Sequence, residues 1–175
     1  MGLRGGMNGL RFEKLRVLIV DDNPHMRRLV VAIIQAFGVR DYFESPDGEH
    51  AWRHMREFNP DIILLDCELP GMTGIEFGRL VRNSPRSPNP FIPIIMLTGH
   101  THIDQVRQAR DAGINDFLAK PVSVKSVLAR LTNVIENPRP FIRCDSYFGP
   151  CRRRPKSGVV YKGPERRASE FTPVE

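Results

Sequence analysis

Short apolar runs alternate along the chain with longer segments in which apolar residues recur at helical spacing. The apolar runs predict five strands, near residues 16–20, 40–44, 61–65, 93–97 and 115–118. The segments between and after them predict five helices, at 24–37, 47–58, 73–83, 101–112 and 123–136. Apart from 40–44, the strands are almost unbroken in their apolar character, which is typical of parallel strands buried on both faces. The pattern therefore predicts an α/β fold, a doubly wound parallel sheet with helices on both sides.

Local signals support the ends of these helices. Pro24 suits a first helical turn and Gly38 a C-terminal cap, while Gly113 and Pro138 follow the predicted ends of two later helices. The segment 83–90 contains three prolines, so we expect an irregular surface loop there.

Polar residues of a particular kind stand where four of the strands end. Because the carboxyl ends of parallel strands line one crevice, residues far apart in sequence can meet there. Three carboxylates, a hydroxyl and an ammonium would suit a divalent cation together with a phosphoryl group, since hard cations take oxygen ligands and lysine neutralises phosphate oxygens. The residues are Asp21, Asp22, Asp66, Thr98 and Lys120.

Charge is distributed unevenly along the 175 residues. Residues 138–175 hold nine of the 26 basic residues and four of the 20 acidic ones, so the preceding part is nearly neutral. The same segment contains six prolines and few aliphatic residues. We therefore expect a flexible leader at 1–13, one domain at 14–137, and a basic, poorly ordered tail at 138–175.

The cysteines and the hydropathy pattern indicate the cellular compartment of the protein. Cys67, Cys144 and Cys151 form neither a CxxC pair nor an even set, which argues against a disulfide framework and a zinc site. No apolar run approaches the roughly 20 residues of a membrane span. We expect a cytoplasmic protein that makes no contact with membranes.

A short motif occurs twice in the basic tail. An aromatic residue, a Gly-Pro pair and two arginines recur fourteen residues apart, at 147–153 and 161–167. Tyrosines beside arginines can stack on bases and pair with phosphates. The tail therefore offers candidate binding residues for nucleic acid or a phosphorylated ligand, at Tyr147, Arg152, Arg153, Tyr161, Arg166 and Arg167.

The strand-end residues and their flanking sequences resemble the receiver domain of bacterial two-component response regulators, the CheY-like family. The resemblance rests on the Asp21-Asp22 pair, Asp66 followed by Leu-Pro-Gly-Met at 69–72, Thr98-Gly99 and Lys120-Pro121. It covers roughly residues 14–136 and implies a flavodoxin-like (βα)5 fold with strand order 2-1-3-4-5.

The resemblance also implies a role for each strand-end residue. Asp66 would accept the phosphoryl group, and Mg²⁺ would be held by Asp21, Asp22, Asp66 and the main-chain carbonyl of Glu68. Lys120 would pair with Asp66 in the empty site and with the phosphoryl group afterwards.

Further roles concern the switch itself. Thr98 would turn its hydroxyl onto the phosphoryl group, Phe117 would turn inward with it, and Pro121 would follow a cis peptide. The donor would be a histidine kinase or a histidine phosphotransfer protein, and the output a contact with an unknown downstream protein.

Several positions carry simpler interpretations or depart from the family pattern. His50 and His54 have the spacing of a metal pair but lack a third ligand, so we expect a solvated helix face. Thr73 replaces the usual Asp before the third helix and can still cap it. Ser126 replaces a Glu common in receivers that dimerise through their last two helices, so we expect a monomer or weak dimer.

Three functions compete on this evidence. The first is a phosphorylation-activated signalling switch, which is not an enzyme acting on an external substrate although it catalyses its own phosphorylation and slow dephosphorylation. The second is a receiver whose basic tail binds nucleic acid or a phosphorylated ligand. The third is a metal-dependent phosphatase with an aspartyl-phosphate, weakly suggested by Asp66-Cys67-Glu68.

Overall fold

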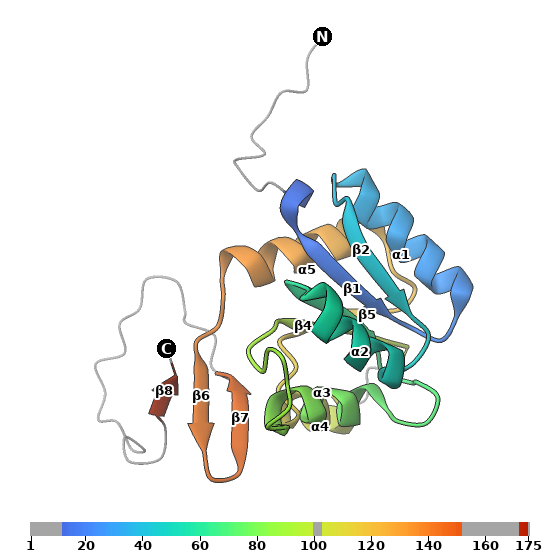
Figure 1. Cartoon of the computed structure of the whole chain (residues 1–175). Coiled ribbons are helices and arrows are strands. Elements are labelled where there is room, and N and C mark those ends of the chain that lie inside the picture. Colours follow the sequence, from blue (N-terminus) through green and yellow to red (C-terminus); the bar gives the residue numbers. More distant parts are fainter. Residues whose placement is uncertain (1–11, 100–102, 152–171, 175) are drawn as a thin grey trace.

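The computed structural model describes residues 12–99, 103–151 and 172–174 (Figure 1). Its centre is a five-stranded parallel sheet of order β2-β1-β3-β4-β5. The fold class and strand order predicted from the sequence are therefore confirmed. The strands are β1 (Arg16–Val20), β2 (Asp41–Ser45), β3 (Ile62–Asp66), β4 (Ile94–Thr98) and β5 (Asp116–Ala119). The last four begin one residue later than predicted.

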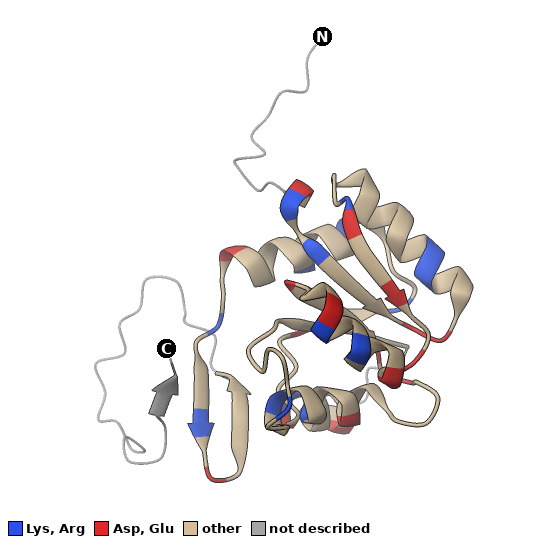
Figure 2. Cartoon of the chain, viewed as in Figure 1, with Lys and Arg blue, Asp and Glu red and all other residues tan. Residues whose placement is uncertain are grey.

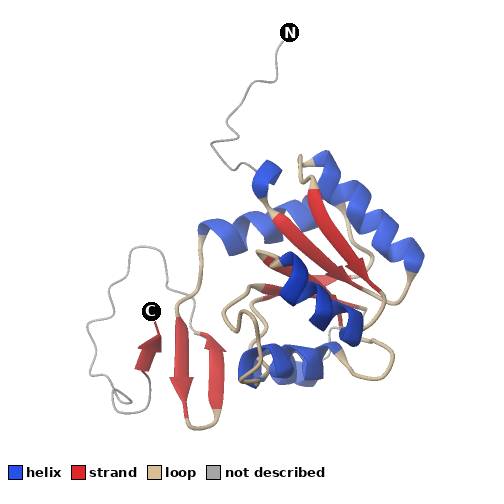
Figure 3. Cartoon of the chain, viewed as in Figure 1, coloured by secondary structure: helices blue, strands red, loops and turns tan. Residues whose placement is uncertain are grey.

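Five helices cover the sheet on its two faces (Figure 3). They are α1 (Pro24–Ala36), α2 (Gly48–Phe58), α3 (Gly74–Asn83), α4 (Ile103–Asp111) and α5 (Val124–Glu136). Two buried clusters form the core: α1 and α5 pack on one face, and α2, α3 and α4 on the other. Successive side chains of a strand point to opposite faces, so Val17 and Ile19 of β1 belong to the first cluster and Leu18 and Val20 to the second. This explains why buried strands lack apolar-polar alternation.

The predicted leader is too long at its carboxyl end. A 3₁₀ turn, η1 (Phe12–Lys14), precedes β1, and Phe12 is buried in the first cluster with its ring 6.3 Å from that of Phe37. The core therefore begins at Phe12, because an aromatic ring buries apolar area that a free leader would leave in water. Residues 1–11 lie outside the described part of the chain.

The prediction of a poorly ordered tail is wrong for residues 141–150. They form an antiparallel hairpin, β6 (Phe141–Cys144) and β7 (Tyr147–Pro150), joined by β8 (Thr172–Val174) in a second sheet of order β7-β6-β8. The hairpin lies beside α3, away from the parallel sheet (Figure 1), and carries little charge (Figure 2). Arg152, Arg153, Tyr161, Arg166 and Arg167 lie outside the described residues.

Aromatic side chains hold the hairpin against the domain. The ring of Phe91, in the loop before β4, lies 5.3 Å from those of both Phe141 and Phe148. Phe148 and Tyr147 are buried, and the Tyr147 hydroxyl donates a 2.8 Å hydrogen bond to the carbonyl of Pro150. Tyr147 is therefore a packing residue, and its burial contradicts its place among the candidate binding residues of the tail.

A buried arginine lies beneath the hairpin. Arg82, near the end of α3, is 2% exposed and donates hydrogen bonds to the carbonyls of Gly113 and Pro90 and to Asn115 Oδ1, at 3.0, 2.7 and 3.0 Å. Its guanidinium also lies 5.1 Å from the centre of the Phe141 ring. Burial lowers the pKa of Arg82 to about 9, so the side chain is still charged at neutral pH. Arg82 thus links α3 to the loops that lead into β4 and β5.

Candidate functional site: an acidic cluster at the carboxyl ends of the strands

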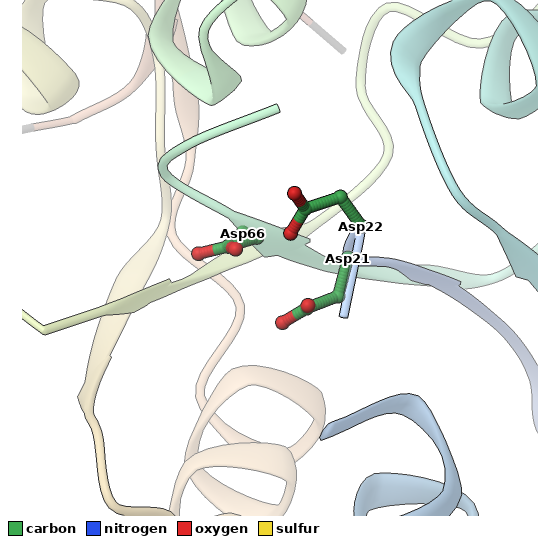
Figure 4. Close-up of side chains that lie close together, drawn as sticks. All are labelled: Asp21, Asp22 and Asp66. Carbon is green, nitrogen blue, oxygen red and sulfur yellow. The ribbon is translucent and has the colours of Figure 1, made fainter. Parts of the chain in front are cut away.

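Three aspartates from two neighbouring strands meet at one edge of the sheet (Figure 4). Asp66 is the last residue of β3, and Asp21 and Asp22 directly follow β1, which pairs with β3 in parallel register. One ligand oxygen from each of the three carboxylates lies within 4.8 Å of the others. Asp21 is fully buried and Asp66 is 6% exposed, whereas Asp22 is exposed to solvent.

Lys120 bridges two of these carboxylates. Its Nζ lies 2.9 Å from Asp66 Oδ1 and 3.0 Å from Asp21 Oδ2. The family resemblance implied the pairing with Asp66 but not the one with Asp21. The Lys120–Pro121 peptide bond is cis, as expected.

The site shifts the pKa values of its charged groups. Burial, together with the negative charge of Asp21, raises the pKa of Asp66, although hydrogen bonds from Lys120 and from the main chain of Glu68 oppose the rise. Burial alone would lower the pKa of Lys120, but hydrogen bonds to Asp66 and Asp21 outweigh it and raise that pKa. The site therefore holds three carboxylates and a single ammonium, and its negative charge is not fully neutralised. A divalent cation would neutralise the rest, and the carboxylate oxygens are ligands that such a cation prefers.

The remaining predicted site residues lie on β4, on β5 and in the loop after β3. Thr98 ends β4 and is buried, and its carbonyl accepts a 2.8 Å hydrogen bond from the Lys120 main-chain N–H. Phe117, on β5, is half-buried and packs against the second core cluster. Glu68 is exposed, just beyond Asp66.

Local sequence explains how the loops approach Asp66 so closely. Thr73 caps α3 as predicted, in a capping box with Glu76. Gly74 begins that helix, and a Cβ at this position would meet the main-chain oxygen of Asp66. Only glycine lets α3 begin this near to β3, a requirement that the sequence analysis missed. The Thr-Gly pair before an apolar run is the signal that could have indicated it.

The two histidines with the spacing of a metal pair make separate contacts. His50 Nδ1 lies 2.8 Å from Asp47 Oδ2, and His54 Nδ1 lies 2.8 Å from Ser45 Oγ, so the two histidines do not share a ligand. Burial, with the negative charges of Asp66 and Glu68, raises the pKa of the Cys67 thiol, which keeps it protonated at neutral pH. A thiolate nucleophile is therefore not favoured there.

The fold and the acidic site define a doubly wound α/β protein with a cluster of aspartates at the carboxyl ends of its strands. The model of the response regulator receiver domain matches residues 17–132, and the chain belongs to this family. It therefore contains the phosphorylation-activated switch of two-component signalling. Membership favours a phosphoacceptor over the metal-dependent phosphatase considered from the sequence.

Individual relatives show how far the likeness extends. The chain is 31% identical over 122 residues to the chemotaxis protein CheY of Pseudomonas aeruginosa, across 70% of this chain and 97% of that protein. It is 34% identical over 116 residues to the DNA-binding response regulator MtrA of Mycolicibacterium smegmatis, across 66% of this chain but only 48% of MtrA. The match spans about half of MtrA, and the DNA binding in the name of MtrA is a statement about that protein alone.

Solved structures agree with the sequence relatives. Chemotaxis protein CheY4 of Vibrio cholerae superposes with a TM-score of 0.64 at 32% identity, over 69% of this chain and 98% of that one. The receiver domain of a sensor histidine kinase from Pseudomonas aeruginosa gives 0.62 at 30% identity, over 70% and 98%, and has a magnesium ion in its active-site cleft. In the part of the chain that the structure describes, no helix is long and apolar enough to cross a membrane.

Proposed function

We propose that Asp66 accepts a phosphoryl group from a histidine kinase or a histidine phosphotransfer protein, and that the phosphorylated chain signals by contact with a downstream protein. The observation that carries the proposal is the position of the Asp66 carboxylate, which lies within 4.8 Å of two other carboxylates and 2.9 Å from the Lys120 ammonium. We place the reaction in the cytoplasm, where cysteines such as the three free ones of this chain stay reduced.

In the proposed step an Asp66 oxygen attacks the phosphorus of phosphohistidine. An O–P bond forms, the N–P bond breaks, and its electron pair leaves with the imidazole nitrogen, which then takes up a proton. Because little other covalent chemistry is needed, positioning and charge provide most of the rate. When bound, Mg²⁺ on Asp21, Asp22, Asp66 and the Glu68 carbonyl would offset the negative charge on the transferred group.

The residues around Asp66 then change partners. Phosphorylation turns the Asp66 carboxylate into an acyl group without a negative charge. The Lys120 ammonium therefore leaves Asp66 and pairs with a phosphoryl oxygen. The Thr98 hydroxyl donates to another phosphoryl oxygen, and Phe117 moves further inward. The surface of α4, β5 and α5 reads out the change, because Thr98 and Phe117 lie on the strands beside those helices. Water attack on the acyl phosphate later resets the switch, so the chain is not an enzyme with an external substrate.

The test is incubation with Mg²⁺ and acetyl phosphate, followed by intact-mass spectrometry. Wild type should gain one phosphoryl group, and Asp66→Asn should gain none. Asp41→Asn is the matched control, because Asp41 is an exposed aspartate at the start of β2, at the opposite end of the strands from the site. A mass gain that persists in Asp66→Asn would refute the assignment.

A further inference from the structure

An arginine of α1 contacts the main chain of the loop that carries two of the three site aspartates. Arg27 Nη1 donates hydrogen bonds to the carbonyl of Asp21 at 2.8 Å and to the carbonyl of Asp22 at 3.3 Å. Its Nε donates to Glu44 Oε2 on β2 at 3.1 Å. One guanidinium therefore ties the β1–α1 loop to the neighbouring edge strand.

The two aspartates differ in what else holds them. The buried Asp21 carboxylate accepts hydrogen bonds from the Asn23 main-chain N–H at 2.8 Å and from Lys120 at 3.0 Å. Asp22 is exposed, and among the residues that the structure describes its carboxylate has no hydrogen-bonding partner of its own. It nevertheless faces Asp21 and Asp66 (Figure 4). The direction of the Asp22 side chain therefore depends on the conformation of its main chain.

We propose that Arg27 is a positioning residue for the metal site, which fixes the main chain of Asp21 and Asp22 so that the Asp22 carboxylate points at Asp66. The inference rests on the proposed Mg²⁺ site. Residues that orient metal ligands from outside the coordination sphere commonly change metal affinity by about 10–100-fold when mutated.

The sign of the effect separates this role from simple electrostatics. A positive charge near a cation site weakens cation binding, so removing it should tighten binding if charge alone mattered. In this structure Glu44 pairs with Arg27 and offsets its charge. If Arg27 acts through geometry, its removal should weaken Mg²⁺ binding instead.

Lysine is not expected to replace arginine here. The contacts use two nitrogens of one planar group, Nε toward Glu44 and Nη1 toward the two carbonyls. A lysine ammonium has the same charge but is a single point on a flexible chain, without the rigid fork. Arg27→Lys therefore keeps the charge and loses the geometry.

The matched control is the next residue along α1. Arg28 is exposed, and its Nε donates to the carbonyl of Pro24 in its own helix, away from the acidic loop. Arg28→Gln removes the same charge from the same helix without touching Asp21 or Asp22.

The experiment measures Mg²⁺ affinity by isothermal titration calorimetry on the full chain, with no phosphodonor present. Urea unfolding without Mg²⁺ is measured in parallel and shows how far each variant is folded. We expect Arg27→Gln and Arg27→Lys to weaken Mg²⁺ binding about tenfold, and Arg28→Gln to remain within about twofold of wild type. A purely structural role would lower stability and leave the affinity of the folded protein unchanged.

Glu44→Asp keeps the test decisive if the Arg27 variants do not fold. It keeps the negative charge but shortens the side chain that orients the guanidinium, so a geometric role predicts weaker Mg²⁺ binding than in Arg28→Gln, whereas charge alone predicts no change. Arg27 variants that bind Mg²⁺ as tightly as Arg28→Gln, or more tightly, would overturn this inference and leave the proposed function standing. A wild-type chain that binds no Mg²⁺ and gains no phosphoryl group would instead overturn the proposed function.

Discussion

Phe148→Ala tests whether the C-terminal hairpin is part of the folded domain. Phe148 is 6% exposed, and its ring contacts Phe91 from the domain and Phe141 from the paired strand. Arg143 also lies over it, 4.4 Å from the ring centre. Truncation to alanine removes all of these contacts while leaving the hairpin backbone in place.

The expected loss can be built from these contacts. Burying a phenylalanine side chain contributes about 1.5–3 kcal/mol. Each aromatic pair adds about 0.5–1.5 kcal/mol. The free energy of unfolding should therefore fall by about 3–5 kcal/mol, the usual range for Phe→Ala in a core.

An upper limit follows from the topology. If the damaged hairpin can detach while the parallel sheet stays folded, the loss cannot exceed the free energy with which the hairpin docks. That docking free energy is the difference in the free energy of unfolding between the full chain, in which β8 also pairs with β6, and a chain that ends at residue 137. Phe148→Ala should therefore cost no more than this truncation, and both should cost more than a surface change.

The assay is urea unfolding, followed by circular dichroism and by the fluorescence of Trp52. Trp52 is the single tryptophan and packs on α2 against the second core cluster, so it reports on the parallel sheet rather than on the hairpin. Leu29→Ala is the control, since Leu29 is 44% exposed and belongs to neither core cluster, and it should cost about 1 kcal/mol. A Phe148→Ala loss no larger than that of Leu29→Ala would refute the docking argument.

Four further outcomes concern the acidic site and α3. Because the folded-state pKa of Asp66 is raised, its contribution to stability is greatest below the unfolded value of 3.8 and is lost as the pH rises through the folded pKa. Without Mg²⁺, the stability advantage of Asp66→Asn over wild type should therefore grow as the pH is raised from 3.8, which unfolding across pH will measure. Mg²⁺ at 100 times its dissociation constant should raise the wild-type free energy of unfolding by about 2.7 kcal/mol, and by less in Asp66→Asn at the same concentration. Gly74→Ala should cost about 1–3 kcal/mol and slow phosphorylation by acetyl phosphate, because the added methyl meets the main-chain oxygen of Asp66. Gly99→Ala is its control for stability, because a Cβ there meets none of the described residues within 4 Å. Thr73→Ala removes the capping box of α3 and should cost about 1 kcal/mol in the same unfolding assay, with no cost expected if the cap is not formed in solution.

The strands and the strand-end residues could be predicted because they depend on local pattern. A strand buried on both faces must be apolar throughout, so the run at 62–65 and its end at Asp66 are visible in the sequence. Parallel strands with helical connections bring their carboxyl ends to one edge, which places Asp21, Asp66, Thr98 and Lys120 together.

The hairpin could not be predicted, because its stability comes from partners distant in sequence. Prolines and arginines dominate residues 138–154, and such composition alone is typical of disorder. The rings of Phe141 and Phe148 become buried only because Phe91, in a loop about fifty residues earlier, lies opposite them. No local sequence pattern indicates this long-range contact between the rings.

Apolar periodicity and the geometry of a parallel sheet are enough to predict the fold class, the order of the elements and the identity of the charged groups at the strand ends. How those groups are held depends on long-range contacts that are visible in the folded protein alone. The structure shows Lys120 bonded to Asp21 as well as to Asp66, Arg27 bonded to the loop behind the carboxylates, and Arg82 beneath a folded hairpin. These contacts join residues on separate elements, and their geometry exists only once the sheet has brought the elements together.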